Sequence, residues 1–200
     1  MMPKTRFVIP SIAFVMGISA LAMFAADKGF QAGSAAGYAH QTSDQVTVGA
    51  KPYNTEELTA EPFGKKTNLL KYGVLPVLVV IENKRHETLD LRDMEVSLVG
   101  ADGRHVAAVS PEDLPYLGTA GKHPGMSPVR IPLPKKKNPL NAPEIVTRAF
   151  SAKMLPPGDS ASGFIYFEAQ SEPGDKLYVN GLRDGRSGQD ILYFEFPVEK

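Results

Sequence analysis

The stretch VLPVLVVIEN, residues 74–83, decides the class of fold. Nearly all of its residues are apolar and half are β-branched, so both alternating sets of side chains avoid water. A strand with this pattern is covered on both faces, and the sequence therefore predicts a central strand here. Pro76 should lie near its start, where no donor to the ladder is needed. We expect Val79 and Ile81 to be among the most buried residues.

Shorter segments with alternating apolar and polar residues follow this run. Residues 89–92 (LDLR) and 94–98 (MEVSL) alternate as half-buried antiparallel strands do, and Asp102-Gly103 closes a hairpin into residues 104–109. The alternation in 89–92 places Asp90 and Arg92 together on the solvent side. The total is seven or eight short strands, because four more segments carry strand patterns: residues 46–48, 164–168, 177–179 and 191–196.

Helical spacing is confined to two segments. Residues 143–154 predict one helix of about three turns, since Pro143 suits the first turn and Arg148 and Lys153 suit the negative end of the helix dipole. Residues 111–117 predict a shorter helical turn. The sequence therefore predicts a mainly β fold, an immunoglobulin-like antiparallel β-sandwich of seven to eight strands with one or two short helices.

The pattern Val77-x-Val79-x-Ile81-x-Asn83, with the alternating segments after it and the turn at Gly103, resembles a known architecture. It is similar to the immunoglobulin-like sandwich modules of bacterial extracytoplasmic proteins of unassigned function. The resemblance covers residues 74–109 and concerns architecture alone, because the antibody-type Cys…Trp…Cys core is missing. Such modules bring no catalytic residues to transfer.

Composition excludes several classes of protein. The 200 residues include 18 glycines and 17 prolines without a repeating period, and neither cysteine nor tryptophan occurs. Collagen, disulfide scaffolds, thiolate zinc sites and cysteine nucleophiles are therefore excluded. The 22 basic and 22 acidic side chains give a net charge of zero. No glycine-rich nucleotide-binding motif is present, so we expect no cofactor.

The N-terminus carries an export pattern. Lys4 and Arg6 precede residues 7–26, which hold no charge, as in a signal peptide. The run also approaches the ~20 apolar residues that a spanning helix needs, so residues 1–26 are either a cleaved signal or an N-terminal membrane anchor. Pro10 and Gly17 weaken the helix and favour cleavage. Because the chain has no cysteine, a lipid anchor attached to an N-terminal cysteine is excluded.

Residues 27–44 are small and polar and lack a period, which predicts a flexible tether ahead of a β-sandwich domain over residues 45–200. Removing residues 1–26 takes away Lys4 and Arg6 but no acid, and leaves a net charge of about −2. Nucleic acid is therefore not an expected partner, because phosphate binding needs a strongly basic domain.

Four sets of residues carry groups that could form a chemical site. Residues 158–163 (GDSASG) lack the second glycine of a nucleophile elbow and predict a turn into a strand. The histidines lack metal-ligand spacing, and residues 180–190 lack an EF-hand pattern. Glu87, Asp90 and Asp93 fit a solvated face better than an acid–base pair. The residues in question are His40, His86, His105 and His123, and the oxygen donors Asn180, Asp184 and Asp190.

Residues 118–143 form the most informative segment. It is rich in proline, carries five cations and no acid, and is far longer than the usual loop of ~4–6 residues. A solvated linker and a contact site are both compatible with this composition. The residues predicted to contact a partner are Lys122, Arg130, Ile131, Lys135, Lys136 and Lys137.

The sequence thus favours a non-enzymatic exported module that binds or scaffolds something at the cell envelope, periplasmic or secreted, or anchored to the inner membrane. The expected partner is an envelope protein or an anionic membrane surface, and residues 7–26 offer a membrane attachment. Two alternatives remain at this stage: an envelope hydrolase with a dispersed site, and a structural subunit of a membrane complex held by an uncleaved helix.

We predict that the mature chain begins between Asp27 and Gln41, because the export pattern ends at residue 26 and an open tether is accessible to a peptidase. N-terminal sequencing of protein from the native envelope measures this directly. Recovery of Met1 from the membrane fraction would establish the anchor instead.

Overall fold

A computed structural model describes residues 30–117, 138–191 and 193–198. Its strands are β1 (Ala39–Ser43), β2 (Val46–Pro52), β3 (Val74–Asn83), β4 (Leu89–Asp90), β5 (Glu95–Val99), β6 (His105–Val109), β7 (Met154–Leu155), β8 (Ser160–Glu168), β9 (Lys176–Asn180), β10 (Arg183–Asp184) and β11 (Phe194–Pro197). The α-helices are α1 (Glu56–Phe63) and α2 (Pro143–Thr147), and the 3-10 turns are η1 (Ala35–Gly37), η2 (Leu70–Tyr72), η3 (Leu114–Tyr116) and η4 (Pro139–Asn141).

The strands form two antiparallel sheets. The larger sheet has the order β1-β2-β3-β8-β6-β5-β9-β11, and β10-β4-β7 form a small sheet. The larger sheet curls until its two edge strands approach each other, where the backbone N–H of Glu195 in β11 donates to Gln41 Oε1 in β1. This nearly closed sheet belongs to the sandwich or barrel-like class and confirms the predicted mainly β, antiparallel fold.

β3 lies between β2 and β8, and both of its faces are buried. Val79 and Ile81 are fully buried, as the sequence predicts. Pro76 is the third residue of the strand, and its carbonyl accepts from the N–H of Tyr53, beyond the end of β2. Because a residue's N–H and C=O face the same neighbour in an antiparallel ladder, the missing donor of Pro76 costs no bond to β8.

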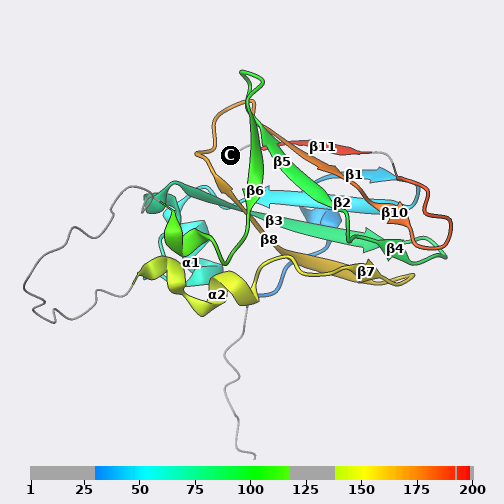
Figure 1. Cartoon of the computed structure of the whole chain (residues 1–200), viewed down its shortest axis with the longest axis horizontal. Coiled ribbons are helices and arrows are strands. Elements are labelled where there is room, and N and C mark those ends of the chain that lie inside the picture. Colours follow the sequence, from blue (N-terminus) through cyan, green and yellow to red (C-terminus); the bar gives the residue numbers. More distant parts are fainter. Residues whose placement is uncertain (1–29, 118–137, 192, 199–200) are drawn as a thin grey trace, which may run out of the picture.

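Alternate residues of β3 enter two separate hydrophobic clusters. Val77, Val79 and Ile81 face the inner cluster, enclosed by the curled sheet. Leu78 and Val80 face the outer cluster, which the helices cover. Figure 1 shows α1 and α2 gathered on one side of the sheet, away from β4, β7 and β10. The covering layer supplies apolar side chains from helices and turns: Phe63, Leu69, Leu114, Leu140 and Ile145.

The predicted tether over residues 27–44 is wrong where the structure describes it. β1 pairs with β2 from Ala39↔Ala50 to Ser43↔Val46, and Ala35 is fully buried. The small side chains make this packing possible, since a Cβ on Gly49 would lie 2.4 Å from the carbonyl oxygen of Ala35. The folded part therefore begins by Phe30, whose ring lies 5.3 Å from that of Phe164. Of the predicted starts of the mature chain, only those from Asp27 to Phe30 leave this part whole.

The helix predicted over residues 143–154 is also too long. α2 ends at Thr147 because the next residues join the sheet. Phe164 N–H donates to Arg148 O at 2.8 Å, and Phe150 N–H donates to Phe164 O at 3.0 Å. The helical turn predicted in residues 111–117 is present as η3. Sequence reasoning missed α1, whose first turn is capped by the Thr55 hydroxyl.

We predict that Gly49→Ala lowers the free energy of unfolding by about 1–3 kcal/mol, because the added methyl group collides with the backbone of Ala35. Gly37→Ala is the matched control, since a Cβ there meets nothing within 4 Å. Urea denaturation of both variants measures the difference. Equal stability of the two would mean that residues 30–38 do not pack on the sheet.

Candidate functional site

The residues predicted to contact a partner, from Lys122 to Lys137, fall outside the described ranges, but both flanks of that segment are described. Leu114 in η3 and Leu140 in η4 are buried in the same outer cluster. Asn138 links the flanks directly, because its Nδ2 donates to the carbonyl of Pro115 at 2.9 Å. The segment thus leaves and re-enters the protein at one place on the helical layer.

The strands on either side of this segment belong to one sheet. β8, which follows it in sequence, pairs with β3 and with β6, which precede it. A linker between separate domains has its flanking strands in different sheets. Residues 118–137 therefore connect two parts of a single folded unit, and a solvated linker and a contact site are both still compatible with their composition.

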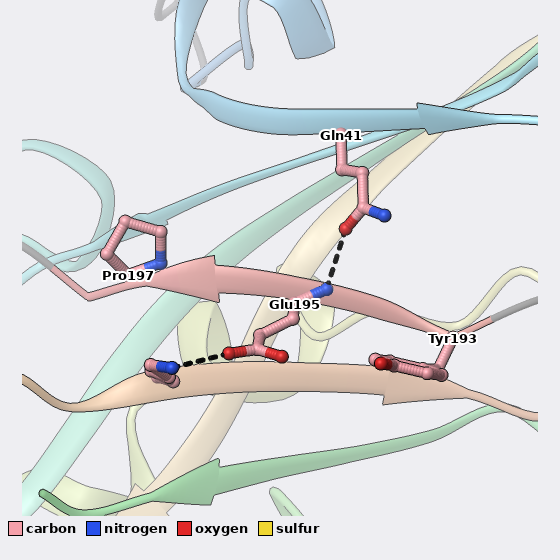
Figure 2. A pocket seen from close by; sticks show the side chains of 5 residues that line it. Gln41, Tyr193, Glu195 and Pro197 are labelled. Atoms are coloured by element: carbon pink, nitrogen blue, oxygen red, sulfur yellow. Dashed lines mark hydrogen bonds and ion pairs between the residues drawn. The ribbon is translucent and has the colours of Figure 1, made fainter.

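A second candidate lies on the outer face of the sheet where β11 approaches β1, which we call the β1–β11 seam. Figure 2 shows Gln41 from β1 above Glu195, with Tyr193 and Pro197 on either side along the chain of β11. Lys176 in β9 completes the lining, and the cavity volume is about 580 Å³. These side chains point outward, because Phe194 and Phe196 between them fill the inner cluster.

Contacts at the seam are a salt bridge and a ring stack. Lys176 Nζ donates to Glu195 Oε1 at 2.7 Å. The Tyr178 and Tyr193 rings are stacked at a centroid distance of 6.1 Å, and Tyr193 is 56% exposed. The hydrogen bond from Lys176 lowers the pKa of Glu195, and burial, followed by a hydrogen bond to Glu195, raises the pKa of Tyr178.

The seam therefore combines aromatic surface with groups that donate and accept hydrogen bonds, which suits binding. Sequence reasoning missed it for two reasons. Gln41 falls in the segment predicted as a tether, and Tyr193 and Glu195 fall in residues 191–196, which were predicted only as a strand. The alternation of residues along β11 was the available signal. Tyr193 and Glu195 alternate with the buried Phe194 and Phe196, which places the first two on the outer face.

In the turn of residues 180–190, a candidate calcium site because of its oxygen donors, the two aspartates are already bonded to other groups of the protein. Asp184 Oδ1 accepts from the Ser187 backbone N–H at 2.6 Å, and its Oδ2 accepts from Arg85 at 2.6 Å. Asp190 pairs with Arg183 at 2.6 Å. In the described part of the chain, no group of three or more His, Cys, Asp or Glu residues is placed to hold a metal ion.

The remaining candidate residues are Asp90, the GDSASG segment and the histidines. Arg92 holds Asp90 at the surface and lowers its pKa to about 2. In the GDSASG segment the turn is confined to the start, with Gly158 at φ +80°, because β8 begins at Ser160 and so includes the rest of the segment. Three histidines, His40, His86 and His105, are exposed, and His123 lies outside the described ranges.

We predict that Asp184 makes stability depend on pH. The N–H of Ser187, above all, lowers the pKa of Asp184 in the folded protein. The stabilisation that the ionised Asp184 gives the folded state is therefore complete above the usual aspartate pKa of ~3.9. It is lost as the pH falls through the lower folded-state pKa. Asp184→Asn should melt at a lower temperature than wild type at neutral pH and lose less stability from about pH 5 to about pH 2. Thermal melts across this range measure both effects.

Asp113→Asn serves as the control, because Asp113 is an exposed aspartate whose side chain makes no capping bond. Parallel pH profiles for wild type and Asp184→Asn would contradict the prediction.

Comparison with known proteins gives remote structural likenesses. No family model and no curated protein matches the chain. A candidate lipoprotein of Bacillus subtilis has a TM-score of 0.41 at 14% identity, over 82% of this chain and 39% of that one. A secreted protein of Mycobacterium tuberculosis has a TM-score of 0.34 at 16% identity, over 82% and 95%. A functionally unknown protein of Listeria monocytogenes has a TM-score of 0.37 at 14% identity, over 80% and 82%.

This chain thus spans less than half the length of the Bacillus protein. With TM-scores below 0.5, these likenesses transfer neither fold nor function. Within the described ranges, no helix combines the length and apolar character needed to cross a membrane, and the apolar residues 7–26 lie outside those ranges.

Proposed function

We propose that the protein is a non-enzymatic, exported binding or scaffolding module of the cell envelope. Its contact element is the basic segment of residues 118–137, and its partner is an anionic membrane surface or an envelope protein. The observation that carries this proposal is the closure of the segment at Asn138 and Pro115, which presents it from one fixed place on the helical layer. Export rests on the N-terminal pattern of residues 1–26, and the immunoglobulin-like resemblance remains a prediction.

Charge separation supports this role for the segment. Residues 118–137 carry five cations without an acid, whereas the whole chain has a net charge of zero. The rest of the chain is therefore about −5 and is repelled by the surface that attracts the segment. This opposition orients the protein on an anionic partner. Prolines restrict the free segment, which reduces the entropy lost on binding.

The ionised groups of the described residues support a binding role over the hydrolase alternative. Glu195, Asp90 and Asp184 have lowered pKa values, each held by a neighbouring donor. Carboxylates held in the charged form are poor proton donors near neutral pH, whereas a general acid needs a raised pKa. Their contacts instead tie strands and turns together.

We predict that replacing Lys135, Lys136 and Lys137 with glutamine weakens binding to vesicles containing phosphatidylglycerol by about a hundredfold at low salt, at about 1 kcal/mol per lysine. The loss should shrink as salt is raised, because the Debye length falls from ~10 Å at 0.1 M to ~3 Å at 1 M. Vesicle co-sedimentation across a salt titration measures both effects.

The matched control removes three cations at the far end of the sheet, by changing Lys84, Lys153 and Arg186 to glutamine. Binding by this control should match wild type. If both triple variants bind alike, the segment is not the contact element. If wild type does not bind the vesicles but retains an envelope protein that the first variant loses, the partner is that protein.

A further inference from the structure

A hollow on the outer face of the sheet shares no lining residue with the β1–β11 seam. It opens beside β3 and β8, between the first described residues and the chain that leaves α2, and its volume is about 460 Å³, the size of a small-molecule site. Its lining includes Phe30, Gln31, Arg148, Ser151 and Ser162.

Arg148 is the one charged side chain in this lining, and its guanidinium has no polar partner among the described residues. Its Nη1 is covered from solvent and makes no hydrogen bond, and the guanidinium forms no ion pair with any described residue. The guanidinium carbon lies 5.7 Å from the centre of the Phe30 ring. Arg148 as a whole is half-buried, but a covered N–H donor without an acceptor is costly, so this site favours the entry of an anion.

The position of Arg148 is fixed by its backbone. Its N–H donates to the carbonyl of Glu144 in α2 at 3.1 Å, and its carbonyl accepts from Phe164 in β8 at 2.8 Å. The backbone of Arg148 is thus fixed where the helix joins the sheet, and the contact with the Phe30 ring orients its guanidinium. A binding group that is positioned in advance loses little entropy when its ligand arrives.

The rest of the lining restricts the kind of anion. Gln31, Ser151 and Ser162 bring neutral polar side chains that bond to no other described residue, while Phe30 brings apolar surface. One guanidinium matches one carboxylate in charge and geometry. A phosphate dianion needs more positive charge than these lining residues supply.

We propose that this hollow binds a small ligand bearing a single carboxylate, with Arg148 pairing the carboxylate and Phe30 contacting the apolar part. The proposal uses no residue of the basic segment and goes beyond the function proposed above. It makes the protein a receptor for an organic acid as well as a contact module.

Benzoate and benzamide are suitable probes, because they have the same shape and differ in charge. We expect wild-type full-length chain to bind benzoate at least about tenfold more tightly than benzamide or inorganic phosphate, as the loss of a hydrogen bond to a charged group implies. Amide signals around Arg148 and Ser162, followed by NMR titration, measure the affinities. Equal binding of benzoate and benzamide, or tighter binding of phosphate, would overturn the proposal.

Arg148→Gln should reduce benzoate binding to the level of benzamide, whereas Arg104→Gln, at an arginine exposed at the β5–β6 turn, should leave it unchanged. Retained benzoate affinity in a folded Arg148→Gln variant would contradict the assignment. The comparison of probes on wild type decides the matter even if this variant fails to fold.

Asp27 is the only acid in residues 1–29, three positions before Phe30, and its carboxylate is the competing occupant. Asp27→Asn tests it. If benzoate binds this variant but not wild type, Arg148 pairs with the chain's own carboxylate and the proposal of an external ligand is wrong.

Discussion

The burial of both faces of β3 is the constraint on which the rest of the structure depends. The residues from Val74 to Ile81 are all buried, and they divide between two clusters, to which the neighbouring β8 also contributes on both faces. Burying a side chain of this size contributes roughly 1.5–3 kcal/mol, so one strand supports both cores. The curled sheet and the helical layer each complete one of these cores, and neither is stable without the strand between them.

In a strand that is apolar on both faces, the hydrophobic pattern does not fix the pairing register. A shift of one residue against the neighbouring strands only exchanges one apolar set of side chains for the other. Close backbone contacts decide it instead. Gly49 pairs with Val80 and leaves room for Ala35, while Gly163 pairs with Val79 and lies against the backbone of Phe150. A side chain at either glycine would collide with these neighbours, so each contact fits only one alignment.

The two halves of the outer face of the sheet differ in whether helices cover them. Over β3 and β8, the helical layer covers apolar residues, holds both ends of residues 118–137 and encloses the hollow at Arg148. Over β9 and β11, no helix covers the face among the described residues, and its side chains are polar or aromatic. The covered half provides fixed attachment points, and the open half provides contact area.

Local patterns determined the strands and the mainly β class, because alternation and β-branching are properties of neighbouring residues and need no distant partner. Ala35 and β1 carry no such pattern. They fold because Gly49, on the next strand, leaves space for them. The end of α2 was likewise decided by Phe164, whose backbone bonds to Arg148 and Phe150 are stronger competitors than another helical turn. Arg148 could be predicted only as a cation near a helix end. Its place in a hollow depends on contacts between segments far apart in the sequence, which only the tertiary structure brings together.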